Sequence, residues 1–138
     1  MTEEKIRTLG QERAEYALDK VNVVLKKSFR DKFKPLSSSA SSMILKNGFG
    51  QTLAFWLAKS KMEQGKHLEL FNIVKDWLTD KKFVHIDGHD EKAFVMSISK
   101  MSQEKYLMAQ NETIALLEWV KRYANAFIED DKGDKRDD

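Results

Sequence analysis

The chain has 138 residues and a net charge of only +2, with 41% hydrophobic and 33% charged residues. This length suits one domain with one hydrophobic core, and the absence of any run of about 18 apolar residues argues against a membrane span. Because the chain has no cysteine, disulfides, thiolate zinc sites and cysteine nucleophiles are excluded, and a cytoplasmic location is expected.

The charge is distributed unevenly along the sequence. Between Lys20 and Met62 there are nine basic residues and one acid, Asp31, so this segment carries a net charge of +8 and the remainder carries −6. Such asymmetry within one small domain favours a polyanion as a partner, although an ordinary solvated surface could have the same composition.

Helix-breaking residues are few, and the apolar residues between them recur at helical spacing. We therefore predict an all-α fold, a single compact bundle of about six helices. This domain is expected to span residues 1–129. Residues 130–138 contain no apolar residue, so we expect them to form a disordered acidic tail.

The first two helices are expected over residues 3–28 and 36–47. Thr2 can cap the first helix, and Pro35 suits the first turn of the second. Serine-rich composition makes 36–47 a possible linker, but apolar residues at helical spacing favour a helix. Gly48 follows at the position where a left-handed residue commonly ends a helix.

The third and fourth helices are expected over residues 49–62 and 66–79. The predicted inward stripe of the third helix is Leu53, Ala54, Leu57 and Ala58. Phe55 and Trp56 lie off this stripe, so they either pack against another helix or face a partner. Since aromatic residues are favoured at interfaces, we predict that both contact a neighbouring subunit.

The stretch from Asp80 to Asp90 is ambiguous. It could form a strand that enters an Asp-Gly hairpin, but no other strand is evident for it to join, so we predict a loop. A short helix over 90–101 follows. The last and longest helix is expected to have Ser102 as its N-cap and to extend through Phe127.

One cluster resembles a set of metal ligands: His85, Asp87, His89 and Asp90. Imidazole and carboxylate groups at close spacing can bind zinc or iron, but no second motif supplies the remaining ligands. Gly48 and Gly50 lack the third glycine and the lysine–serine pair of phosphate-binding loops, so a helix-to-helix turn is expected. We therefore predict no catalytic residues, no metal and no cofactor.

The basic segment can act without special geometry, because lysine and arginine bind nucleic-acid phosphates without reading sequence. Phe29 and Phe33 lie among these residues and could stack on bases, although packing in the core is the more common role. The residues predicted to bind nucleic acid are Lys26, Lys27, Arg30, Lys34, Lys46, Lys59 and Lys61.

Three stretches of the chain resemble one known family. They are residues 13–21 (RAEYALDKV), 44–58 (ILKNGFGQTLAFWLA) and 106–124 (YLMAQNETIALLEWVKRYA). In this order and spacing, they resemble the small all-helical subunit, subunit five, of the type III-B (Cmr) CRISPR effector complex. The Asn47-Gly48 turn and the Trp-Val-Lys-Arg sequence at 119–122 are the most specific pieces.

The resemblance implies a non-catalytic subunit that stacks with copies of itself as a minor filament along the guide–target RNA duplex in antiviral defence. It implies as partners the guide RNA, the target RNA, the repeated backbone subunit and the large polymerase-like subunit, with no membrane involved. The alternative is a freestanding helical protein that binds nucleic acid or acts as an adaptor.

Overall fold

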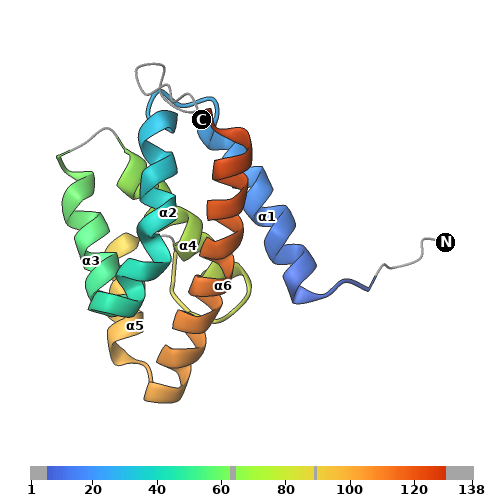
Figure 1. Ribbon diagram of the computed structural model, residues 1–138. Helices are drawn as coiled ribbons and strands as arrows, with labels where there is room; N and C mark the ends of the chain where they lie inside the picture. The colour runs from blue at the N-terminus through green and yellow to red at the C-terminus, as the bar shows by residue number, and fades with distance from the viewer. Residues whose placement is uncertain (1–5, 63–64, 89, 130–138) are drawn as a thin grey trace.

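The computed structural model describes residues 6–62, 65–88 and 90–129, and these residues form six α-helices and no strand (Figure 1). The helices are α1 (Leu9–Val24), α2 (Arg30–Asn47), α3 (Phe49–Ser60), α4 (Lys66–Asp80), α5 (Glu91–Lys100) and α6 (Gln103–Phe127). The predicted all-α bundle is therefore confirmed. The predicted tail, 130–138, lies outside the described residues. None of the described helices is long and apolar enough to cross a membrane.

The helix α6 packs against both α1 and α2, and α3 packs against α4. Figure 1 shows α2 and α6 running in opposite directions, with the α1–α2 turn and the end of α6 at one end of the bundle. We call this the α1–α2 end. The start of α6, the helix α5 and the α2–α3 turn lie at the opposite end, which we call the α5–α6 end.

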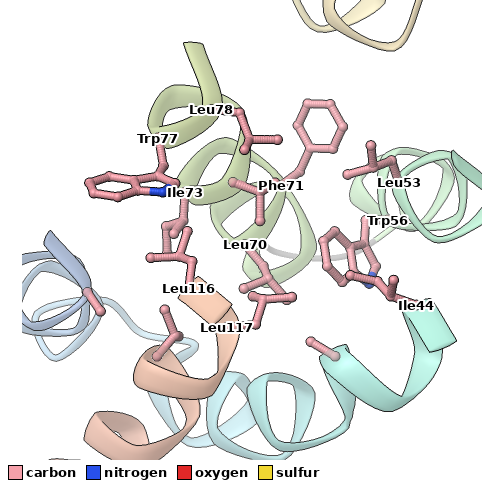
Figure 2. Packing of buried hydrophobic residues seen from close by; sticks show 14 of the residues in the cluster. Ile44, Leu53, Trp56, Leu70, Phe71, Ile73, Trp77, Leu78, Leu116 and Leu117 are labelled. Carbon is pink, nitrogen blue, oxygen red and sulfur yellow. The ribbon is translucent and has the colours of Figure 1, made fainter. Parts of the chain in front are cut away.

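The core is formed by side chains from every helix. Figure 2 shows Ile44 of α2, Trp56 of α3, Leu70 of α4 and Leu117 of α6 pointing toward one another. These residues are at most 1% exposed. Each large apolar side chain buried in this way contributes about 1.5–3 kcal/mol.

The helix α3 buries a different face from the predicted one. Its buried residues are Phe49, Thr52, Leu53 and Trp56, whereas Ala54 is exposed. Phe49, Leu53 and Trp56 follow the i, i+4, i+7 spacing of one helix face, and two large rings gain more from burial than the alanines would. The prediction that Trp56 meets a neighbouring subunit is therefore wrong, since its side chain is 0% exposed. Phe55 remains 43% exposed.

The first helix begins later than predicted, at Leu9. The Thr8 hydroxyl accepts a hydrogen bond from the backbone N–H of Gln11 at 3.0 Å, and the Gln11 side chain accepts one from the Thr8 N–H at 2.9 Å. This reciprocal capping box fixes the start of α1. The predicted cap, Thr2, lies outside the described residues.

The second helix begins earlier than predicted, at Arg30, and contains Pro35 in its second turn. Proline removes one backbone donor there, but Pro35 is exposed, and most of the helix follows it. The basic residues that precede Pro35 are consequently helical. The helix ends at Gly48, whose φ of 94° favours glycine, as predicted.

The remaining elements agree with their predictions within one or two residues. Asp90 accepts hydrogen bonds from backbone N–H groups in the first turn of α5, and Ser102 does the same for α6. Residues 81–88 form a loop with no strand, and Val84 anchors this loop in the core with 2% exposure.

Candidate nucleic-acid interface

Basic side chains project from the turn that joins α1 to α2. The backbone N–H groups of Lys26 and Lys27 donate to the last carbonyls of α1 at 3.1 and 2.9 Å. The turn is thus closed by its own hydrogen bonds, and the side chains of Lys26, Lys27 and Arg30 are exposed. Three cations therefore lie within five consecutive residues on one surface.

Gly65, the residue that precedes α4, lies close to this turn. A Cβ atom added to Gly65, whose φ is 103°, would lie 3.3 Å from the ring of Phe29. Lys61, four residues before Gly65, is exposed and follows the last residue of α3. Lys61 therefore shares the α1–α2 end, and we name the set Lys26, Lys27, Arg30 and Lys61 the basic corner.

The other three predicted basic residues do not belong to this set. Lys46 lies sixteen positions after Arg30 along α2, which corresponds to about 24 Å at 1.5 Å per residue. Lys46 lines a different cavity, of about 490 Å³, together with Phe55. Lys34 is half-buried along α2, and the Lys59 ammonium lies 5.8 Å from the centroid of the Phe55 ring. Of the seven predicted residues, four thus form the basic corner. Lys46 lies at the other end of α2, and Lys34 and Lys59 are half-buried, one turn from Arg30 and two residues before Lys61.

The aromatic residues of this region take structural positions. Phe33 is 0% exposed and belongs to the core, and Phe29 packs partly against the core. The Phe55 ring contacts His67 edge-on, with 6.1 Å between ring centroids. Base stacking by Phe33 is therefore excluded by its burial in this fold.

Acidic residues gather on another surface, between α1 and the end of α4. The carboxylates that line a cavity of about 340 Å³ there belong to Glu12, Glu15, Asp19 and Asp80. Two cations accompany them: Arg7 pairs with Glu15 at 2.8 Å, and Lys81 pairs with Glu12. The hydrogen bond and the charge of Lys81 hold the pKa of Glu12 below its ordinary value. We name the four carboxylates the acidic groove.

The predicted polar loop does not gather metal ligands. The Nε2 atom of His85 lies 4.0 Å from the Asp87 carboxylate, and both side chains are fully exposed. His89 lies outside the described residues, and Asp90 is the N-cap of α5. Among the residues that the structure describes, no three His, Cys, Asp or Glu side chains are placed to hold a metal ion together.

The predicted helix-to-helix turn at Gly48 and Gly50 is confirmed. Gly48 separates α2 from α3, and Gly50 already belongs to α3. The backbone N–H of Gly50 donates to the Tyr106 hydroxyl at 2.9 Å, which joins the turn to the start of α6.

The sequence analysis missed a second group of lysines. Lys81, Lys82, Lys100 and Lys105 line one cavity at the α5–α6 end. In the sequence they are interspersed with acids such as Asp87 and Glu104, so no segment shows an excess of positive charge. Only the fold brings them together.

These features define a class: a small, all-helical protein that presents a basic corner and a separate acidic groove. The family model described as CRISPR-associated protein (Cas_Cmr5) matches residues 9–127. The match begins with the first residue of α1 and ends with the last residue of α6. The chain therefore belongs to the Cmr5 family and is a subunit of a CRISPR Cmr complex, as the sequence resemblance implied.

The fold is also similar to a solved structure, the crystal structure of a CRISPR-associated Cmr5 family protein from Thermus thermophilus. The two share 25% sequence identity with a TM-score of 0.75, over 90% of this chain and 100% of that chain. This chain therefore shares its overall fold with another member of the Cmr5 family.

Proposed function

We propose that this chain is a non-catalytic structural subunit of a cytoplasmic type III-B effector complex in antiviral defence. Copies of it stack as a minor filament beside the repeated backbone subunit, along the guide–target RNA duplex. The observation that carries this proposal is the separation of the basic corner from the acidic groove in a member of the Cmr5 family.

The basic corner faces RNA. Its lysines and arginine are exposed at the tips of turns, where they can reach phosphates without a groove or a base-reading helix. Such contacts are independent of sequence, which suits a subunit that must accept any guide and target. Lys46 contributes less, because it lies at the other end of α2. Lys34 and Lys59 contribute less, because they are half-buried.

The acidic groove faces the next copy of the chain. A contact between two different surfaces of identical subunits is heterologous, and such contacts produce filaments when their rotation does not close a ring. Phe55, which is 43% exposed, adds apolar area to a partner contact. The large polymerase-like subunit would meet the filament at one of its ends.

The decisive experiment is reconstitution of the complex with guide RNA and the other Cmr subunits. The variant Lys26→Glu/Lys27→Glu/Arg30→Glu reverses the corner, and Lys92→Glu introduces an acid on α5, away from the corner. We expect the triple variant to assemble but to bind target RNA more weakly, and we expect Lys92→Glu to resemble the unaltered chain.

Two outcomes contradict the proposal. If the triple variant keeps full RNA affinity but enters the complex in fewer copies, the corner meets the next copy and not RNA. If the unaltered chain purifies without guide RNA and without the larger subunits, the freestanding nucleic-acid-binding or adaptor protein is the better description.

A further inference from the structure

A cavity of about 740 Å³ opens at the α5–α6 end, between the loop that follows α4, the end of α5 and the start of α6. This volume is within the range of small-molecule sites. Four lysines line it, Lys81, Lys82, Lys100 and Lys105, and the described lining residues include no aspartate or glutamate. Positive charge is therefore concentrated around a cavity that is large enough for a small-molecule ligand.

Three of the four lysines are available to a ligand. Lys81 is engaged, because its ammonium pairs with Glu12 and lies 5.3 Å from the centroid of the Trp77 ring. Lys82, Lys100 and Lys105 are exposed. None of them takes part in the ion pairs of the described residues. The first turn of α6 also reaches the cavity and adds the positive end of a 25-residue helix dipole.

The backbone at Lys82 is unusual for a lysine. The N–H of Phe83 donates to the carbonyl of Leu78 at 2.9 Å, and the N–H of Lys82 donates to that of Thr79 at 3.1 Å. This is the Schellman pattern, in which the left-handed residue is usually glycine. Lys82 holds that position with a φ of 67°. The chain thus keeps a lysine at the cavity at a conformational cost that glycine would avoid.

The wall of the cavity is partly apolar. Phe83, Met101 and Met108 line it together with the lysines. An aromatic ring and thioethers give a base or another flat ring a surface on which to pack. An acidic peptide would use the lysines but would leave this wall without a partner.

We propose that this cavity binds a phosphorylated nucleotide, its phosphate among Lys82, Lys100 and Lys105 and its base against Phe83 and the methionines. The nucleotide is either a free mononucleotide or one unit of an RNA strand, since both offer the same chemistry. The site lies at the end opposite the basic corner, so this proposal does not depend on RNA binding at that corner.

The test is a titration of the full chain, followed by amide chemical shifts of residues around Ser102 and Lys105. The probes are adenosine monophosphate, adenosine, inorganic phosphate, hexa-uridylate and an aspartate-rich peptide. We expect adenosine monophosphate to shift these amides at lower concentration than adenosine or phosphate alone. If hexa-uridylate saturates at still lower concentration, the source is an RNA strand, and otherwise it is a free nucleotide.

Three variants assign the site. Lys100→Ala and Lys105→Ala should each weaken mononucleotide binding by about tenfold, because each removes a charge-assisted contact to phosphate. Lys92→Ala, which removes an exposed lysine of α5 that does not line the cavity, should leave binding unchanged. The melting temperature of each variant shows whether the fold is intact.

Lys82→Gly separates binding from stability. Glycine relieves the left-handed strain, so we expect the melting temperature to rise by about 2–5 °C while mononucleotide binding weakens. The proposal is overturned if the lysine variants bind as tightly as the unaltered chain, or if adenosine binds as well as its monophosphate. It is also overturned if the peptide displaces the nucleotide and binds more tightly.

Discussion

Arg13 of α1 and Glu112 of α6 are joined by two parallel hydrogen bonds, each of 2.8 Å, between the guanidinium and the carboxylate. The indole N–H of Trp77 donates to the same carboxylate at 2.7 Å, so three helices meet at one acid. Glu112 is 6% exposed. A buried carboxylate is tolerated only when it is paired and hydrogen-bonded, and here both conditions are met.

Removing this carboxylate should destabilise the fold more than any surface substitution. Glu112→Ala leaves the guanidinium of Arg13 and the indole N–H of Trp77 without their acceptor, and we expect a loss of about 3–5 kcal/mol in the free energy of unfolding. Urea denaturation measures this loss. The double variant Arg13→Met/Glu112→Leu, which removes both charges, should recover part of it. Equal stability of Glu112→Ala and the unaltered chain would contradict the assignment.

Adjacent aromatic residues on α3 should behave oppositely. Trp56→Ala empties a fully buried position and should cost about 3–5 kcal/mol. Phe55→Ala should cost less than about 1.5 kcal/mol, because the ring is 43% exposed. In the reconstituted complex, however, Phe55→Ala should lower the number of copies incorporated. If Phe55→Ala assembles normally, this ring has no role at the interface.

Two glycines with similar positive φ angles provide a matched pair. Gly65 and Gly88 have φ of 103° and 86°, but only a Cβ at Gly65 would meet a neighbour, the Phe29 ring at 3.3 Å. Alanine at either position should cost about 1–2 kcal/mol for the left-handed backbone. Gly65→Ala should cost more, because the ring must move. Thermal melts of both variants test this, and a smaller loss for Gly65→Ala than for Gly88→Ala would contradict it.

Tyr16 should make the fold sensitive to alkaline pH. Its hydroxyl donates to the carbonyl of Ile73 at 2.7 Å. Burial, aided by the nearby carboxylates of Asp76 and Asp80, raises the pKa of Tyr16 above its ordinary value. A raised pKa in the folded state gives stability that is present in full below the unfolded pKa of about 10 and is lost as the pH rises further.

The corresponding variant is Tyr16→Phe. It should be less stable near pH 7 by about 1 kcal/mol, because the hydrogen bond to Ile73 is lost. Above a pH of about 10, its stability should fall less steeply than that of the unaltered chain. Urea unfolding at several pH values between about 8 and 11, which bracket the ordinary tyrosine pKa, measures both effects. Parallel curves for the two proteins would mean that Tyr16 does not govern the alkaline transition.

Local signals explain how much of the fold could be predicted. Gly48 and Ser102 mark helix ends through their own backbone or side chain, and both predictions were correct. The start of α2 was predicted wrongly because Pro35 was placed in a first turn, although an exposed proline is tolerated one turn later. The start of α1 was missed although Thr8 and Gln11 carry the capping box in the sequence.

The candidate sites were harder to predict, because they depend on contacts between distant segments. Trp56 was assigned to an interface because the inward face of α3 was predicted to be Leu53, Ala54, Leu57 and Ala58. Packing against α2 and α4 instead buries Phe49 and Trp56 together with Leu53. Lys46 was grouped with Lys26 by sequence charge, although the length of α2 separates them. Lys82 and Lys105 show the opposite case. They line the same cavity, but they are far apart in the sequence and lie in no segment with an excess of positive charge.

The final prediction concerns the salt dependence of RNA binding. If Lys26, Lys27 and Arg30 contact phosphates, each releases counterions on binding, and the logarithm of the RNA affinity falls linearly with the logarithm of salt concentration. Removing one such contact in every copy, for example with Lys26→Ala, should lower the slope by about 0.7–0.9 per contact. Lys46→Ala, at the other end of α2, should change the slope less.

The measurement is the affinity of the reconstituted complex for target RNA at several salt concentrations, which gives the slope for each variant. An unchanged slope for Lys26→Ala with assembly intact would remove RNA from the basic corner, and a larger effect of Lys46→Ala would place RNA at the α5–α6 end instead.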